Sequence, residues 1–154
     1  GPGNLSSLRV GISAANIFAS FAKVPVYGIS SFLLYAFNYE YSNKNLITLF
    51  DLKNDNFAYA KFIKENSKIS LIESDFNINL NRIELIDMNN SIIVGTGLKK
   101  YKKKYQNNST PTSFLDEDFK ITSESLANVD LDFQENLIFN KMPLVPFNSY
   151  SFGS

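Results

Sequence analysis

Residues 5–22 (LSSLRVGISAANIFASFA) constrain the fold most, because they predict a long helix that is polar on only one narrow side. Its polar residues recur at spacings of three and four, which places them on one helix face. They are Ser6, Arg9, Ser13, Asn16 and Ser20. At about 100° per residue this face covers roughly 80° of the circumference, and the rest is largely apolar. Such a helix must be covered on two sides, either within its own core, between a sheet and a neighbouring helix, or partly by another chain.

The middle of the apolar side carries small residues, and larger ones flank it. The small residues are Ser7, Gly11, Ala15 and Ala22, with Phe18 among them; the flanking ones are Leu5, Leu8 and Ile12 on one edge and Val10, Ile17 and Phe21 on the other. A glycine inside a helix costs about 1 kcal/mol relative to alanine. We therefore expect Gly11 to mark the close approach of another backbone.

Composition excludes several classes of enzyme. The 154 residues suffice for one domain with a core, or for a large piece of a two-domain protein. The chain contains no Cys and no His, which excludes a Ser-His-Asp triad, a Cys-His dyad and a histidine zinc site. Basic and acidic residues number 15 each, so no net charge attracts nucleic acid or an anionic membrane, although a local patch still can. The sequence shows neither a signal peptide nor an apolar stretch of membrane-spanning length, and a cytoplasmic protein is expected.

The remaining sequence predicts strands and helices of an α/β fold. Strands are expected at 24–29, 46–51, 57–65, 67–73 and 92–94, the second and third as a hairpin. Helices are expected from Ser30 or Ser31 to about Phe37, from Leu98 onward, and more weakly at 123–128. Residues 81–87 (NRIELID) fit either a helix or a strand. The polar stretch 38–45 is the best candidate for a boundary between subdomains.

The first thirty-one residues carry a family resemblance. They are similar to the signature segment of the TsaB (YeaZ) family, in which a GPG turn leads into a small-residue helix, a strand and a Ser-Ser pair. The matching positions are Gly1, Pro2, Gly3, Leu8, Arg9, Gly11, Ala15, Pro25, Gly28, Ser30 and Ser31. Because they keep register without a gap, Gly1-Pro2-Gly3 is interpreted as native rather than as a tag remnant. Weaker similarities follow at Asp51 and Lys53, in IIVGTGLKKY, and at Pro143 and Pro146.

The chain also departs from the family pattern. Ser7 stands where the family usually has Gly and Asn16 where it has Lys, Tyr59 is displaced by one position, and the closing Tyr-Leu-Arg is absent. Family members carry a strand-rich segment and a long helix before the GPG turn. We therefore expect this sequence to be the later part of such a protein.

The resemblance implies the actin/Hsp70/sugar-kinase-like (ASKHA, ribonuclease H-like) α/β fold. Residues 1–40 would be the remainder of an N-terminal subdomain, and 41–154 a C-terminal α/β subdomain with a loop-rich tail. The paralogue TsaD carries a His-x-x-Gly-His metal motif at the position of SSFLLYAF, which this chain cannot supply without histidine.

The implied role is therefore the non-catalytic partner of TsaD. Together with the ATPase TsaE, the two make threonylcarbamoyladenosine in tRNA; no cofactor is expected in this chain itself, and ATP only at the level of the complex. The residues implied to contact TsaD are Leu5, Leu8, Arg9, Ile12 and Asn16. Two alternatives stay open: an enzyme, either M22 peptidase-like or nucleotide-binding, and a self-associating regulator that pairs the same helix across a two-fold axis.

Three further groups of residues are candidate sites. Gly1, Pro2 and Gly3 could cradle a phosphate or simply form a tight turn. The run KKYKKKY could contact tRNA, with Lys99, Lys100, Lys102, Lys103 and Lys104 on phosphates and the tyrosines stacking on bases, or it could be a solvated helix face. Asp116, Glu117 and Asp118 fit no metal-binding spacing and predict a solvated turn, and Asp51 predicts a turn-capping carboxylate.

Overall fold

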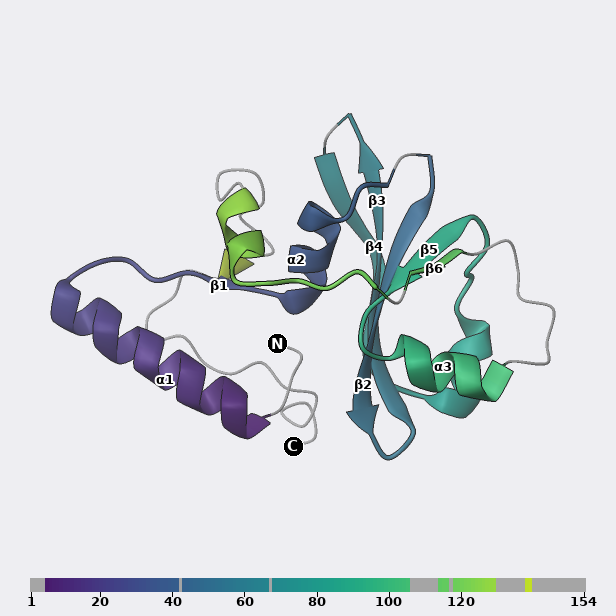
Figure 1. Ribbon diagram of the computed structural model, residues 1–154, viewed down its shortest axis with the longest axis horizontal. Helices are drawn as coiled ribbons and strands as arrows, with labels where there is room; N and C mark the ends of the chain where they lie inside the picture. Colours follow the sequence, from purple (N-terminus) through teal and green to yellow (C-terminus); the bar gives the residue numbers. More distant parts are fainter. Residues whose placement is uncertain are drawn as a thin grey trace. The chain divides into compact units, whose positions relative to one another are not determined.

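The computed structural model describes residues 5–41, 43–66, 68–105, 114–116, 118–129 and 138–139. The chain forms two compact units, the first comprising Gly1–Leu33 and Asp130–Ser154 and the second Leu34–Val129. Figure 1 shows the elements along the chain. The predicted subdomain boundary between residues 40 and 41 rests on the family resemblance and stays a prediction.

The first unit is dominated by the predicted helix, α1, which spans Leu5–Ala22. The helix ends because Lys23 adopts a left-handed conformation with φ 54°. The amide of Val24 then donates to the carbonyl of Ala19 at 3.1 Å, which satisfies an otherwise unpaired group of the last turn.

The strand predicted at 24–29 is wrong at its start. Strand β1 contains only Gly28–Ile29, and it pairs antiparallel with β7, Ile138–Phe139. Pro25 has no amide proton to donate to a ladder, which explains why pairing does not extend back toward the helix. Strand β7 was not predicted, because its pairing joins segments more than a hundred residues apart.

Helix α2, Ser31–Asn38, confirms the predicted N-cap. The Ser30 hydroxyl oxygen accepts a hydrogen bond from the amide of Phe32 at 3.2 Å. From Leu34 onward this helix belongs to the second unit.

The second unit contains a five-stranded sheet of order β4-β3-β2-β5-β6. The strands are β2 (Asn45–Lys53), β3 (Asn56–Glu65), β4 (Lys68–Asn79), β5 (Ser91–Val94) and β6 (Phe114–Asp116). The first three run antiparallel, which confirms the hairpin, whereas β5 and β6 run parallel to β2. Asn54 and Asp55 connect β2 and β3 with φ of 49° and 59°, the two left-handed residues that a tight hairpin turn needs.

Helices cover both faces of this sheet (Figure 1). On one face, Ile47, Leu49 and Phe57 are fully buried and belong to a hydrophobic cluster with residues of α3 (Leu98–Tyr105) and of the 3-10 helix η1 (Leu80–Leu85). On the other face, the ring of Tyr35 in α2 meets the ring of Phe50 edge-on, with centroids 5.5 Å apart. The expected mixed α/β domain is thus confirmed.

Two ambiguous segments are resolved as 3-10 helices. In η1 the Asn79 side chain accepts from the amide of Asn81, a cap that selects a helix rather than a strand. The weakly helical stretch near residue 123 becomes η2, Glu124–Asn128. The side-chain amide of Asn38 in α2 donates to the carbonyl of Ser125 in η2 at 3.0 Å, which ties this segment to the second unit.

Candidate functional site

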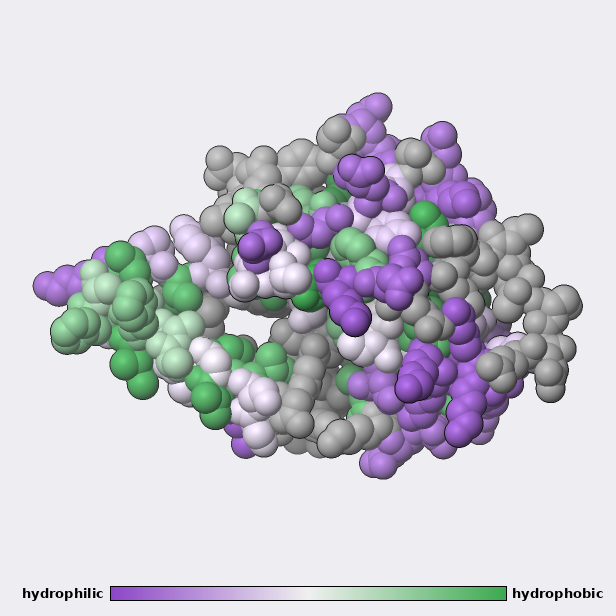
Figure 2. All heavy atoms as spheres, viewed as in Figure 1, coloured by the Kyte–Doolittle hydropathy of each residue, from purple (hydrophilic) through white to green (hydrophobic). Residues whose placement is uncertain are grey.

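Helix α1 exposes one half of its apolar side. The exposed fractions are 71% for Val10, 70% for Ile17, 69% for Phe18 and 90% for Phe21. These residues follow the spacing i, i+7, i+8, i+11 and therefore share one face. Figure 2 shows hydrophobic side chains gathered over this helix. We call these four residues the apolar face of α1.

The opposite half of the apolar side is less exposed. Ala19 is buried, and Leu8, Ile12, Ala15 and Asn16 are half-buried. The expected covering on two sides is therefore present on one side only within the described chain.

The predicted contact residues divide between the two halves of α1. Leu8, Ile12 and Asn16 are on the half-buried side, whereas Arg9 is exposed. The side chain of Leu5 lies outside the described part of the structure. Sequence reasoning assigned Val10, Ile17 and Phe21 to one edge of the helix but did not choose them, because hydrophobic periodicity does not tell which edge the rest of the chain covers.

Gly11 lies between these halves and does not mark close packing within the described residues. A Cβ atom added there would meet no atom within 4 Å. No other backbone of the described residues approaches Gly11, and an approach by the backbone of another chain stays a prediction.

Helix α3 is held far more firmly than α1. Its buried residues Leu98, Tyr101 and Tyr105 recur at i, i+3 and i+7 and face the sheet. The preceding turn also packs on β2: the amide of Gly97 donates to the carbonyl of Leu49 at 2.9 Å, and a Cβ on Gly95 would lie 2.4 Å from that same oxygen. The glycine turn predicted from GTG therefore seats the helix on the sheet.

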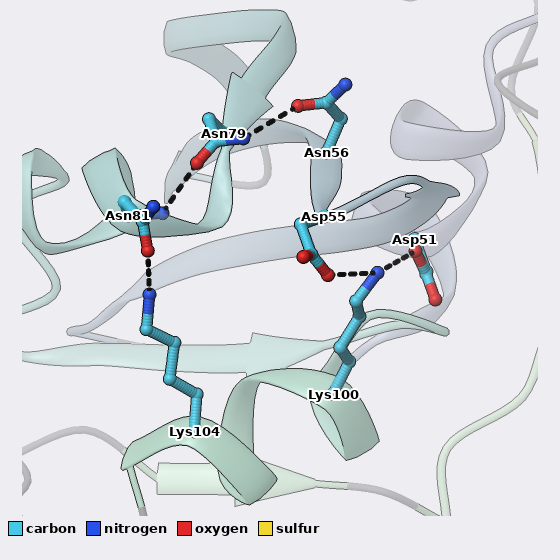
Figure 3. A network of polar contacts seen from close by, with 7 residues as sticks. All are labelled: Asp51, Asp55, Asn56, Asn79, Asn81, Lys100 and Lys104. Carbon is cyan, nitrogen blue, oxygen red and sulfur yellow. Dashed lines mark hydrogen bonds and ion pairs between the residues drawn. The ribbon is translucent and has the colours of Figure 1, made fainter.

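Lys100 connects α3 to the β2–β3 hairpin (Figure 3). Its ammonium lies 3.2 Å from Asp51 and 3.3 Å from Asp55, and 5.4 Å from the centre of the Phe57 ring. Partial burial lowers the pKa of Lys100, but the hydrogen bonds and charges of the two carboxylates outweigh this effect and raise it. Asp51, expected to cap a turn, pairs with this lysine.

Lys104, one turn later, connects α3 to η1. It donates to the side chain of Asn81, whose amide donates to Asn79, and Asn79 donates in turn to Asn56 at 3.3 Å (Figure 3). The two lysines, four residues apart, therefore fix the same side of the helix to two neighbouring elements.

Lys99 and Lys103 form a second pair, also four residues apart, and both are exposed. Among the residues that the structure describes, neither has an ion pair. The tyrosines between the lysines do not share this exposure: Tyr101 and Tyr105 are each 7% exposed, with ring centres 5.0 Å apart. Base stacking by these tyrosines is thus wrong, because both rings belong to the core.

Asp116, the first residue of the acidic run, accepts hydrogen bonds from residues on both sides of it in the sequence. One oxygen of Asp116 accepts from the amides of Asp118 and Phe119 at 3.1 and 3.0 Å, and the other accepts from the Tyr39 hydroxyl at 2.9 Å. Burial, followed by the hydrogen bond and charge of Asp116, raises the pKa of Tyr39 to about 12. Asp116 therefore has a structural role, and Glu117 lies outside the described residues.

The remaining candidate residues add no described site. Gly1, Pro2, Gly3, Pro143 and Pro146 lie outside the described residues. Within the described ranges, no group of three or more Asp and Glu residues is placed to hold a metal ion. No helix in those ranges is long and apolar enough to cross a membrane.

Solved structures define the class of fold. A Pseudomonas aeruginosa protein described as uncharacterized, with similarity to peptidase YEAZ, matches with a TM-score of 0.65 at 18% identity, over 82% of this chain and 59% of that one. YeaZ from Pseudomonas aeruginosa matches with a TM-score of 0.64 at 20% identity, over 82% of this chain and 61% of that one. The chain thus has a YeaZ-like mixed α/β fold and spans about 60% of the length of these structures.

A comparison with models of protein families shows the family to which the chain belongs. The family model for TsaD, tRNA N6-adenosine threonylcarbamoyltransferase, matches residues 1–145. No curated protein matches the chain. The chain belongs to the TsaD/YeaZ family.

Proposed function

We propose that this chain is a YeaZ-type, non-catalytic partner of a TsaD transferase, on an ASKHA fold. Together with TsaE, the pair would make threonylcarbamoyladenosine in tRNA. Family membership and the YeaZ-like fold support this role. So does the absence of histidine, because the TsaD metal motif needs two.

The observation that carries the proposal is the apolar face of α1. Four large apolar residues, each at least 69% exposed, share one side of an eighteen-residue helix. Burying one such side chain contributes roughly 1.5–3 kcal/mol, so their joint burial can support a stable complex. The partner is proposed to pack a helix of its own against this face, with Arg9 at the rim and Gly11 beside the seam.

The half-buried residues are assigned a supporting part in this interface. Leu8, Ile12 and Asn16 would hold the orientation of α1, and the apolar face would supply most of the contact. Gly11 would then permit close approach of the partner's helix, which is the ordinary use of a small residue at a helix crossing.

The test is co-purification with TsaD from the same source organism. Phe18→Asp is expected to weaken the complex by about a hundredfold or more, because an unpaired carboxylate in an apolar interface costs several kcal/mol. Ser13→Asp, on the exposed polar stripe of the same helix, is the matched control and should leave the complex intact. Phe18 is a better test position than Ile12, since Ile12 is half-buried and its loss could also unfold the helix.

Three outcomes separate the candidate functions. A complex that tolerates Phe18→Asp as well as Ser13→Asp rules out the apolar face as the binding surface. The self-associating regulator is favoured if the wild-type chain never binds TsaD but elutes as a dimer, and if Phe18→Asp abolishes that dimer. ATP binding by the chain alone would favour the nucleotide-binding enzyme.

A further inference from the structure

We propose that Lys99 and Lys103 form an RNA-binding face that contacts the phosphate backbone of tRNA. This inference rests on the proposed function for the identity of the RNA, but the surface itself is defined by the structure. It follows from the way that four of the five lysines of α3 divide into two pairs; the fifth, Lys102, is half-buried.

Lys100 and Lys104, which we call the inner pair, already contact other elements of the chain. Lys100 is held by Asp51 and Asp55 at 3.2 and 3.3 Å, and Lys104 donates to Asn81. Two carboxylates compensate the charge of Lys100, and the hydrogen bond to Asn81 holds the exposed Lys104 on the η1 side of the helix. These contacts also fix the rotation of α3 about its axis, together with the buried Leu98, Tyr101 and Tyr105.

Lys99 and Lys103, which we call the outer pair, face solvent because of that same rotation. Lys99 and Lys103 are exposed and lie one helical turn apart on the side away from the buried residues. Since contacts to the sheet, the β2–β3 hairpin and η1 hold the helix, the two side chains project from a fixed helix rather than from a flexible tail. Figure 2 shows hydrophilic side chains gathered over α3, in contrast to the apolar surface of α1.

The composition of this face selects the kind of partner. A helix that lies on a membrane needs an apolar side to insert, but the apolar residues of α3 are all buried against the sheet. A protein interface is usually anchored by aromatic or Arg residues and is depleted in Lys, and the exposed side of α3 carries only lysine. Lysine without an apolar anchor suits the phosphate backbone, whose binding is electrostatic and independent of sequence.

The buried tyrosines define what this face cannot do. Because Tyr101 and Tyr105 pack in the core, α3 offers no ring on which a base could stack. The face should therefore position tRNA without selecting its sequence. Sequence selection would belong to another part of the assembly.

The test is binding of an unmodified tRNA transcript, measured by fluorescence anisotropy over a series of salt concentrations. The full chain is used alone and together with TsaD. Lys99→Gln/Lys103→Gln should weaken binding on the order of tenfold and reduce the slope of log K against log salt by about two. Lys44→Gln/Lys68→Gln is the matched control, because it removes the same charge from two other exposed positions of the second unit and should change neither quantity.

Equal losses in the two double variants would overturn the proposal, because the effect would then come from total charge. No effect of Lys99→Gln/Lys103→Gln would overturn it as well, as would a wild-type chain that does not bind tRNA under either condition. One further outcome would assign the face to a membrane instead. In that outcome, binding to vesicles of phosphatidylserine and phosphatidylcholine depends on Lys99 and Lys103, whereas tRNA binding does not depend on them.

The RNA-binding face and the proposed function can fail separately. If the chain never co-purifies with TsaD but loses tRNA binding in Lys99→Gln/Lys103→Gln, the face stands and the TsaD partnership fails. If the complex forms and tRNA binding is unchanged by the double variant, the partnership stands and the face fails.

Discussion

Helices α1 and α3 are opposite in composition and in how much of their apolar surface the chain covers. Helix α1 is mostly apolar, yet it leaves Val10, Ile17, Phe18 and Phe21 exposed. Helix α3 contains five lysines in eight residues, yet it is seated by three buried side chains and by the contacts of Lys100 and Lys104. The difference teaches that hydrophobicity alone does not tell which helix the chain itself covers.

The charges of the two regions differ in the same way. Between residues 5 and 33 the only charged side chains are Arg9 and Lys23. The second unit holds the ion pairs that the structure describes, and it uses them to fix elements to one another. The proposed partner of α1 would therefore be recognised by shape and apolar contact, and the proposed partner of α3 by charge.

The largest expected effect comes from shortening one apolar residue in each helix. Leu98→Ala should lower the free energy of unfolding of the second unit by about 2–5 kcal/mol, because Leu98 is 1% exposed and its loss leaves a cavity. Ile17→Ala should change stability by no more than about 0.5 kcal/mol, because Ile17 is 70% exposed. Urea unfolding followed by circular dichroism measures both.

This pair of variants also tests the comparison itself. Comparable destabilisation by Leu98→Ala and Ile17→Ala would mean that the chain covers the apolar face of α1 in solution, and the contrast between the helices would be lost.

A second contrast uses one substitution at two glycines. Gly95→Ala should destabilise by about 2–4 kcal/mol, since φ is +113° and the added Cβ would lie 2.4 Å from the carbonyl oxygen of Leu49. Gly11→Ala should stabilise α1 by up to about 1 kcal/mol, because the new methyl group meets open space and alanine favours the helix. Thermal unfolding gives the sign of each change.

Gly11→Ala gains a second meaning in the presence of TsaD. If the partner's backbone approaches α1 closely at Gly11, the variant should be more stable alone and bind TsaD more weakly. Unchanged binding would remove Gly11 from the proposed seam.

Local signals in the sequence predicted the local elements. The periodicity of residues 5–22 predicted α1, Ser30 predicted the start of α2, and the polar residues between two apolar runs predicted the β2–β3 hairpin, which turns at Asn54 and Asp55. Each of these depends on residues within one turn or one hairpin, so the sequence contains the whole interaction.

Features that depend on distant pairing were missed. Strands β6 and β7 are formed by short segments whose partners lie far along the chain, and such segments have no pattern of their own. The division of the lysines of α3 was also missed, because it depends on where Asp51, Asp55 and Asn81 meet the helix. Periodicity could have separated Lys99 and Lys103 from the core-facing tyrosines, but it could not have found the carboxylates.

The smallest expected effect concerns acid, to which the two regions should respond differently. The amide of Asn89 and the charge of Lys61, whose ammonium lies 3.4 Å from Asp87, hold the pKa of Asp87 below its ordinary value of 3.8. A carboxyl whose pKa is lowered by folding stabilises the fold above its unfolded pKa, and this contribution is lost as the pH falls through the lower, folded value. Wild type should therefore exceed Asp87→Asn in stability by a constant amount above about pH 5, and the difference should shrink below about pH 4.

Helix α1 has no carboxylate to protonate, so amide hydrogen exchange should show acid-dependent opening around Lys61 and none that begins in α1. A stability difference between wild type and Asp87→Asn that stays constant down to pH 3, or opening that starts in α1, would contradict this assignment and place the acid-sensitive contact elsewhere in the chain.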